Sequence, residues 1–354
     1  MRSKPSVQPT EFAIQEGQRC LKAFPLIVLG SGASIPYGLP SMGDLANSLK
    51  KLKFDNKLSD VEQNQWKRFI GLLASKDLES ALQENELSEP LFDRVVQDTW
   101  VQVCQKDTEV FAEIIDNNII LNLIKLYKYL FKSTNKILSV VTPNYDRLAE
   151  YASDMAGFSH FKGFGYGYVR QWSFERQQIP KHYQRLSSRM INIWKVHGCL
   201  DWFIDPNNNV VAITSAKEIP PNCRPAIVTP GIKKYLQTHL EPFRTIISSA
   251  DEVLSKANAF LCIGFGFNDT HICPKLIGRW QKNDVLLVML TKKLSESAKQ
   301  MLQDAKDAPY LAFEESKTGT FMLSNNYPKG EMLPNIDLWS LKGFLENTID
   351  YKGV

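Results

Sequence analysis

The stretch "ILSVVTPNYDRLAE", residues 137–150, decides the fold because it runs from a short apolar strand directly into a helix. Strands of a parallel sheet are mostly apolar in this way when helices cover both faces of the sheet. An amide and a carboxylate, Asn144 and Asp146, stand between the two elements. A turn needs only one such residue, so the pair indicates a chemical role at the end of a buried strand.

Four further apolar runs are expected to form buried strands of the same sheet, with helical patterns between and after them. One helix is expected over 241–256, and another after Ser41, the expected N-cap, with Asp44 completing a capping box. Alternating strands and helices predict an α/β fold with a doubly wound, mostly parallel Rossmann-like sheet. The four runs are "PLIVLG" (25–30), "NIWKVHG" (192–198), "AFLCIGFG" (259–266) and "VLLVML" (285–290).

We expect residues 1–354 to form a single domain that contains insertions. Residues 52–135 show helical spacing without a convincing strand and are interpreted as a helical insert. Residues 151–190 and 201–225 are interpreted as smaller, irregular inserts. The Rossmann-like core is then expected to consist of residues 24–51, 136–150, 191–200 and 226–350.

The composition is that of a soluble globular protein, with 44% hydrophobic and 23% charged residues. A net charge of +4, from 42 basic and 38 acidic residues, is too small to indicate a nucleic-acid or membrane surface. The apolar runs are far shorter than the roughly 20 residues of a membrane helix, and no secretory signal is seen at the start, so a cytoplasmic location is expected. None of the six cysteines forms a C-x-x-C pair, which favours reduced core thiols over zinc ligands.

A glycine-rich turn, "GSGAS" at residues 30–34, follows the first expected strand. Glycines at such a position let the backbone approach a ligand, and the free N–H groups at a helix start favour a phosphate. The spacing is not G-x-G-x-x-G, so a standard dehydrogenase fingerprint fits poorly. A glycine-rich turn without a nucleotide remains an alternative on these residues alone.

His197 ends another expected strand, and a single histidine there can be purely structural. Ligands in open α/β sheets, however, bind at the carboxyl ends of the strands. Gly32, Asn144 and His197 all fall at such ends, on three different strands. This combination is expected of a reactive nucleotide site.

A fourth strand end carries the sequence "CIGFGFNDTHI", residues 262–272. Gly264 and Gly266 end this strand, and Asn268 or Asp269 has the chemistry to accept hydrogen bonds from ribose hydroxyls. The alternative is a plain turn in which Asp269 or Thr270 caps the next helix.

These motifs occur in a fixed order along the chain: Gly-Ser-Gly-Ala-Ser (30–34), Thr-Pro-Asn-Tyr-Asp (142–146), Val-His-Gly (196–198) and Ile-Gly-Phe-Gly-Phe-Asn-Asp (263–269). Together they resemble the sirtuin-like family, and most closely its bacterial branch of NAD hydrolases that act in antiphage defence. The resemblance covers most of the chain, from residue 28 to residue 291, in short islands.

The resemblance implies roles for individual residues. Asn144 would act at the nicotinamide ribose, Asp146 would contact the nicotinamide carboxamide, and His197 would be the catalytic histidine. Thr291 is placed near adenine by its position after the last expected strand. The implied NAD-binding residues are Gly30, Ser31, Gly32, Ala33, Ser34, Gly264, Gly266, Asn268 and Thr291.

Two departures distinguish this chain from the deacylating sirtuins. Those enzymes carry two C-x-x-C pairs that bind zinc, and their first loop continues into Pro-Asp-Phe-Arg, where this chain has "GLPSM" at 38–42. The resemblance therefore implies an NAD+ hydrolase (NADase) that is the effector of a bacterial antiphage, abortive-infection system. NAD+ would be the substrate, with no prosthetic group and no metal. The alternatives are a protein deacylase or ADP-ribosyltransferase, and a non-catalytic sensor of NAD or ADP-ribose.

Uncontrolled NAD+ hydrolysis would kill the host cell, so the activity is expected to be gated. We expect a homo-oligomer and a separate activator such as a HerA-type ATPase or an Argonaute-like protein, and no membrane partner. Nucleic-acid contact is a less favoured alternative, suggested by basic and aromatic residues within 170–189. They are Arg170, Trp172, Phe174, Arg176, Lys181, Tyr183, Arg185 and Arg189.

Overall fold

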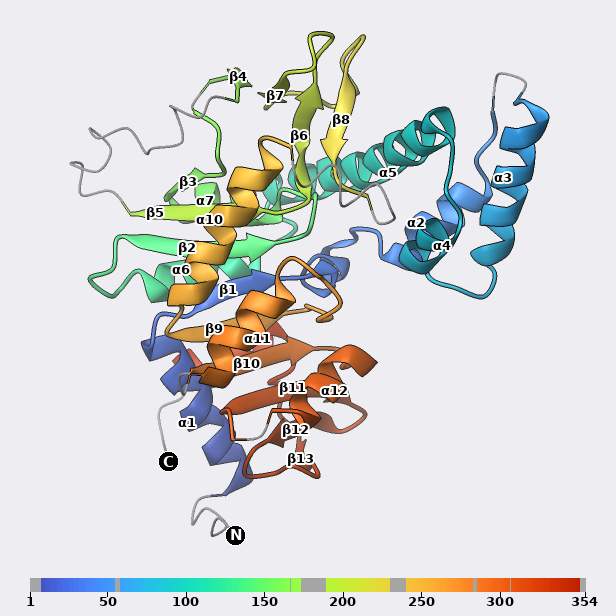
Figure 1. Ribbon diagram of the computed structural model, residues 1–354. Helices are drawn as coiled ribbons and strands as arrows, with labels where there is room; N and C mark the ends of the chain where they lie inside the picture. The colour runs from blue at the N-terminus through green and yellow to red at the C-terminus, as the bar shows by residue number, and fades with distance from the viewer. Residues whose placement is uncertain are drawn as a thin grey trace.

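The computed structural model describes residues 8–54, 58–165, 167–172, 189–229, 240–282, 285–305 and 307–350 of the chain. These residues form a nine-stranded sheet flanked by helices and a smaller four-stranded sheet (Figure 1). Because the large sheet is mostly parallel and helices alternate with its strands, the predicted α/β fold class is confirmed. The division of the chain into a core and inserts stays a prediction.

The strand order of the main sheet is β13-β12-β11-β10-β9-β1-β2-β5-β3. Neighbours from β3 to β11 are parallel, whereas β12 and β13 add an antiparallel edge. All five expected strands are present as β1, β2, β5, β9 and β10. Three end earlier than expected, so Gly30, His197 and Gly264 lie in the connections after β1, β5 and β9. The strands are β1 (Leu26–Leu29), β2 (Ile137–Thr142), β3 (Ser159–Phe161), β5 (Met190–Lys195), β9 (Ala259–Ile263), β10 (Leu286–Thr291), β11 (Tyr310–Ser316), β12 (Gly319–Ser324) and β13 (Glu331–Pro334).

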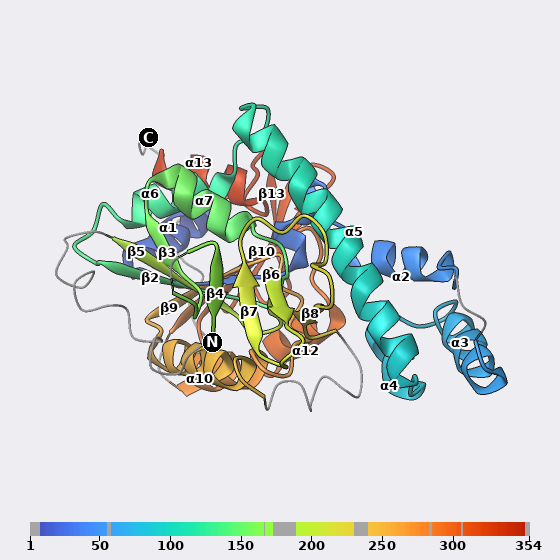
Figure 2. The same cartoon turned by 90° about the horizontal axis from the view of Figure 1, so that it is seen from above.

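Successive side chains of a strand point to opposite faces, and the central strands accordingly divide between two cores. Ile27 belongs to the core that contains residues of α1, α6, α7 and α13, whereas its neighbour Val28 belongs to the core that contains residues of α10, α11 and α12. Figure 2 shows helices above and below the sheet. The helices are α1 (Pro9–Lys22), α6 (Asn122–Leu130), α7 (Leu148–Ala156), α10 (Phe243–Lys256), α11 (Cys273–Lys282), α12 (Glu296–Gln303) and α13 (Leu341–Ile349).

Between β1 and β2 the chain leaves the sheet and forms four helices that extend to one side (Figures 1 and 2). They are α2 (Met42–Lys50), α3 (Asp60–Leu72), α4 (Leu78–Glu84) and α5 (Glu89–Ile115). The expected capping box at the start of α2 is present, because Ser41 accepts from Asp44 N and the Asp44 carboxylate accepts from Ser41 N. The long helix α5 connects this segment to the small sheet, since Trp100 Nε1 donates to Leu200 O at 2.9 Å.

The small sheet has the order β4-β7-β6-β8 and is antiparallel. Its strands are β4 (Val169–Gln171), β6 (Gly198–Ile204), β7 (Val210–Ile213) and β8 (Arg224–Ile227). β6 begins directly after His197, and Val228 N donates to His197 O at 2.9 Å. The small sheet therefore holds the connection that carries the predicted catalytic histidine.

Candidate functional site

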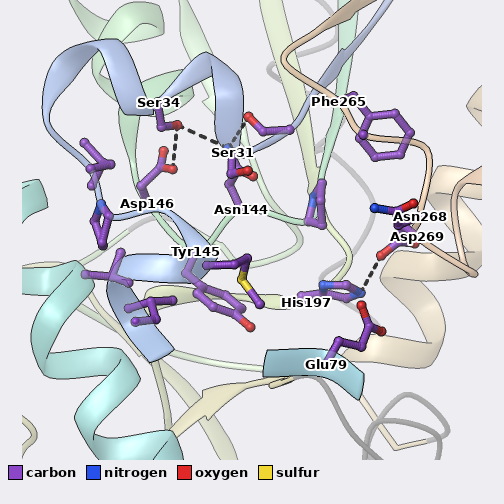
Figure 3. A pocket seen from close by; sticks show the side chains of 18 residues that line it. Ser31, Ser34, Glu79, Asn144, Tyr145, Asp146, His197, Phe265, Asn268 and Asp269 are labelled. Carbon is purple, nitrogen blue, oxygen red and sulfur yellow. Dashed lines mark hydrogen bonds and ion pairs between the residues drawn. The ribbon is translucent and has the colours of Figure 1, made fainter. Parts of the chain in front are cut away.

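A pocket of about 240 Å³ lies where the connections after β1, β2, β5 and β9 meet. The helices α2, α4 and α5 complete its wall. Figure 3 shows the polar side chains that face it. Of the predicted site residues, those that line the pocket are Gly30, Ser31, Ser34, Asn144, Asp146, His197, Gly266 and Asn268.

Four predicted residues lie outside the wall of this pocket: Gly32, Ala33, Gly264 and Thr291. Gly32 and Gly264 instead bring two loops into backbone contact, since Gly32 N donates to Gly264 O at 3.0 Å. A Cβ on Gly264, whose φ is +57°, would lie 2.2 Å from Gly32 C. Glycine is therefore required here for the close approach of the loops. Thr291 Oγ1 donates to Lys293 O at 3.1 Å, in the turn after β10.

Asn144, Asp146 and Ser34 form one hydrogen-bonded network across two strand ends (Figure 3). Asn144 Nδ2 donates to Gly30 O at 2.9 Å and to Ser34 Oγ at 3.2 Å. The Ser34 hydroxyl in turn donates to Asp146 Oδ2 at 2.8 Å. Both amide hydrogens of Asn144 are thus used inside the protein, which leaves its carbonyl oxygen Oδ1 for a donor on a ligand.

The end of β2 positions this amide and carboxylate through the backbone. Thr142 Oγ1 donates to Leu29 O at 2.9 Å and accepts from Asn144 N at 3.0 Å. Asp146 Oδ1 accepts from Leu148 N at 3.2 Å, at the start of α7. The Asp146 main-chain oxygen accepts from the Lys195 ammonium. The strand end, the helix start and β5 together hold Asp146 in place.

Burial raises the pKa of the Asp146 carboxyl, because desolvation penalises its charged form. The nearby Lys195 charge and the hydrogen bonds from Ser34 and Leu148 N oppose this rise but do not cancel it. A carboxyl group with a perturbed pKa in a pocket is a feature typical of functional sites.

His197 faces the pocket from the connection between β5 and β6 (Figure 3). Its Nε2 lies 3.0 Å from Asp269 Oδ2, an ion-pair distance without the angle of a hydrogen bond. Asp269 also holds the turn before α11, because its Oδ1 accepts from His271 N at 2.8 Å and from Ile272 N at 2.9 Å. Asp269 therefore stabilises the turn that leads into α11, and the same residue lies beside His197.

Sequence reasoning missed several residues of the pocket. Glu79 reaches the wall from α4, far from any motif, and no local signal identified it. Tyr145, between the two predicted catalytic residues, donates its hydroxyl to Val228 O at 2.7 Å. Phe265 stands on the loop after β9. Tyr145 and Phe265 belong to the motifs at 142–146 and 263–269. The sequence did not show that their side chains face the pocket.

A chain of buried charges continues behind Asp146, away from the pocket. Lys195 lies 3.4 Å from Glu150 Oε1, and the same oxygen lies 3.4 Å from Lys162 Nζ. Lys162 pairs with Asp201 at 2.8 Å, and Asp201 pairs with Arg170 at 2.8 Å. Burial opposes ionisation of Glu150, but Lys195 and Lys162 together outweigh it and lower its pKa to about 2.

Arg170 belongs to this internal network, since its guanidinium donates to Asp201 and Thr214. It is therefore not part of a free basic surface. Arg189 lies over the Phe131 ring, 5.8 Å from its centroid. The other residues suggested for nucleic-acid contact, except Trp172, lie outside the described residues: Phe174, Arg176, Lys181, Tyr183 and Arg185. The nucleic-acid alternative stays a hypothesis.

Neither a metal cluster nor a membrane helix is present in the part of the chain that the structure describes. No group of three or more His, Cys, Asp or Glu residues there could hold a metal ion. No helix among the same residues is both long and apolar enough to cross a bilayer.

Residues 138–274 match the family of the SIR2-like domain. This part of the chain is therefore similar to a SIR2-like domain. It contains Asn144, Asp146 and His197, whereas the loop 30–34 precedes the matched residues. The matched residues begin in β2 and end in α11, so they include the small sheet.

Solved structures of Sir2 enzymes are similar to the chain at low sequence identity. One, from work on the mechanism and regulation of Sir2 enzymes, is 13% identical over 84% of this chain and 98% of that chain, with a TM-score of 0.42. A structure concerned with sirtuin substrate affinity is 13% identical over 82% and 90%, with a TM-score of 0.41. Sir2Tm bound to a propionylated peptide is 14% identical over 80% and 88%, with a TM-score of 0.40. No curated protein matches the chain.

Proposed function

We propose that the chain is an NAD+ hydrolase that cleaves the bond between nicotinamide and ribose and releases ADP-ribose. The observation that carries the proposal is the meeting of Asn144, Asp146 and His197 around one pocket at the carboxyl ends of parallel strands. Such ends are where open α/β sheets bind nucleotides. The SIR2-like domain supports NAD+ as the substrate.

The size of the pocket favours the reacting half of the dinucleotide. Its volume of about 240 Å³ is below the roughly 300–1,000 Å³ of pockets that bury a drug-sized ligand. We therefore place nicotinamide and its ribose inside it. The adenosine half would extend along Gly266 and Asn268, at the rim formed by the loop after β9.

Asp146 and Asn144 would act on the two sides of the bond that breaks. Nicotinamide leaves from a cationic state, so no strong acid is required, and the ribose develops positive charge as in other glycosyl transfers. Asp146 would bind the carboxamide and orient the leaving group. Asn144 would accept from a ribose hydroxyl through its free Oδ1, while Ser34 and Gly30 hold its Nδ2.

His197 would accept a proton at the other end of the pocket. With Nε2 held against Asp269, Nδ1 is the nitrogen that receives the proton. A histidine suits this step because its ordinary pKa lies near neutral pH. The proton comes from a ribose hydroxyl or from the water that replaces nicotinamide.

In the cell we propose that this enzyme is a cytoplasmic effector of bacterial antiphage defence by abortive infection. The support is the order of the motifs, which resembles that branch of the family. Since free NAD+ hydrolysis would be lethal, we propose that a homo-oligomer and a separate activator, such as a HerA-type ATPase or an Argonaute-like protein, control it.

The test is incubation of the full chain with NAD+ and chromatography of the products, with and without the protein encoded next to it. Equal amounts of nicotinamide and ADP-ribose are expected. Nicotinamide release only in the presence of an acyl-lysine peptide would indicate a deacylase or transferase instead. NAD+ binding without any turnover would indicate a sensor.

A further inference from the structure

One carboxylate of the pocket comes from outside the SIR2-like domain. Glu79 lies in the first turn of α4, in the helical segment between β1 and β2, and lines the same pocket as His197. Figure 3 shows its carboxylate beside the His197 ring. No motif contains Glu79.

The pocket has two chemically different ends (Figure 3). Ser34, Asn144 and Asp146 form the network at one end, next to the loop 30–34. His197 and Glu79 face each other at the opposite end. If the nicotinamide–ribose bond lies between the two ends, nicotinamide faces Asp146. The ribose then faces His197 and Glu79, which can accept protons.

Tyr145 lines the same pocket as Glu79 and His197. Burial is the main cause of the raised pKa of Tyr145, and the charges of Glu79 and Asp269 add to it. Because Asp269 also lies 3.0 Å from His197, the imidazole stands in a field of negative charge.

The stability of α4 does not require a carboxylate at position 79. Asp77 already caps α4, since Ser80 N donates to its Oδ1 at 2.8 Å. An acidic residue in a first turn adds only about 0.3–1 kcal/mol through the helix dipole. A carboxylate in the wall of a pocket, beside an imidazole, is suited to act as a general base.

We propose that Glu79 is a further catalytic residue, which holds and deprotonates the water that attacks the ribose. This inference rests on the proposed hydrolase function. The water oxygen bonds to ribose C1′ while the C1′–N1 bond to nicotinamide breaks, and the bond electrons neutralise the pyridinium nitrogen. The proton of the water passes to the Glu79 carboxylate and then to solvent. Such a residue directs the reaction towards water as the acceptor.

The position of Glu79 also makes the helical segment part of the reaction centre. α4 packs against α2 and α3. The carboxylate is therefore delivered to the pocket by helices that stand beside the sheet rather than on it (Figure 1). Hydrolysis then requires both the SIR2-like domain and this segment.

The experiment compares the full chain with E79Q, E79D and the control E84Q. Glu84, at the other end of α4, is exposed, pairs with Lys76 and lies outside the pocket wall. E79Q is expected to lower kcat about 10²-fold or more, in the range of general-base catalysis, with KM and calorimetric ADP-ribose affinity within about threefold. E79D should recover part of the rate, and E84Q should match the parent chain.

Three results would overturn the inference. If E79Q turned over at the parent rate while N144A and H197A did not, Glu79 would have no catalytic role and the proposed function would stand. If E79Q and E84Q lost activity equally, charge or folding of α4 would explain the loss. A parent chain that released no nicotinamide under any condition would remove the proposed function, and the role of Glu79 with it.

Discussion

The Ser34 hydroxyl donates a hydrogen bond of 2.8 Å to Asp146 Oδ2, across 112 positions of the sequence. Ser34 belongs to the glycine-rich turn after β1, and Asp146 to the turn after β2. Since β1 and β2 are parallel neighbours, their carboxyl ends lie side by side and the two turns meet. One hydrogen bond thus joins the expected phosphate loop to the expected nicotinamide contact.

The first prediction concerns the two residues that carry the proposed function. N144A and H197A should each lower nicotinamide release by about 10²–10³-fold or more, the cost of losing a preorganised polar group. Both variants should keep the thermal midpoint of the parent chain within a few degrees, because neither residue lies in the apolar cores. N207A and H160A, at sites outside the pocket, are the matched controls. Near-normal turnover of either active-site variant would refute the assignment.

The second prediction concerns Ser34. S34A should destabilise the fold by about 1–3 kcal/mol, because Asp146 Oδ2 loses a donor and Asn144 Nδ2 loses an acceptor. It should also lower kcat more than it raises KM, because the groups that touch the substrate lose their orientation. Urea denaturation and steady-state kinetics measure the two effects. S255A, on the exposed end of α10, provides the comparison and should change neither value.

The third prediction concerns the contact between the two glycine loops. G264A should displace them, because its Cβ would lie 2.2 Å from Gly32 C and its φ of +57° is unfavourable for alanine. We expect loss of measurable ADP-ribose binding in calorimetry and a lower thermal midpoint. G278A, in the interior of α11 with open space around it, should stabilise the chain by up to about 1 kcal/mol. Equal behaviour of the two variants would contradict this account.

The fourth prediction concerns acid stability. The folded-state pKa of Glu150 is about 2, below its ordinary value. A depressed carboxyl pKa contributes stability that is present above the unfolded pKa and is lost as the pH falls through the folded pKa. The free energy of unfolding of the parent chain should therefore decline between about pH 4.5 and pH 2, with a contribution from Glu150 of roughly 3 kcal/mol.

E150Q tests this contribution. It should be destabilised by about 3–5 kcal/mol at pH 7, because the buried charges of Lys195 and Lys162 lose a partner. Its decline between pH 4.5 and pH 2 should be shallower than that of the parent chain. E346Q, at an exposed position on α13, should reproduce the parent curve. Parallel curves for the parent chain and E150Q would show that Glu150 does not titrate as expected.

Local patterns predicted much of the sheet. The runs that became β1, β2, β5, β9 and β10 are continuously apolar, which is characteristic of strands buried on both faces. The strands β3, β11, β12 and β13 of the main sheet and the whole small sheet were not predicted. Their residues alternate or are interrupted by polar groups, and such short segments become strands only through their neighbours.

The sequence by itself determined the fold class and the candidate chemistry of Asn144, Asp146 and His197. Apolar periodicity and polar residues at strand ends are local properties, so they can be read without coordinates. Only the tertiary structure decided which residues share the pocket. It placed Glu79 in the wall and Thr291 outside it, and it made Gly264 a packing residue against Gly32. The reason is physical: a contact between segments far apart in the chain depends on how the sheet and the helical segment pack, and no local pattern encodes that distance.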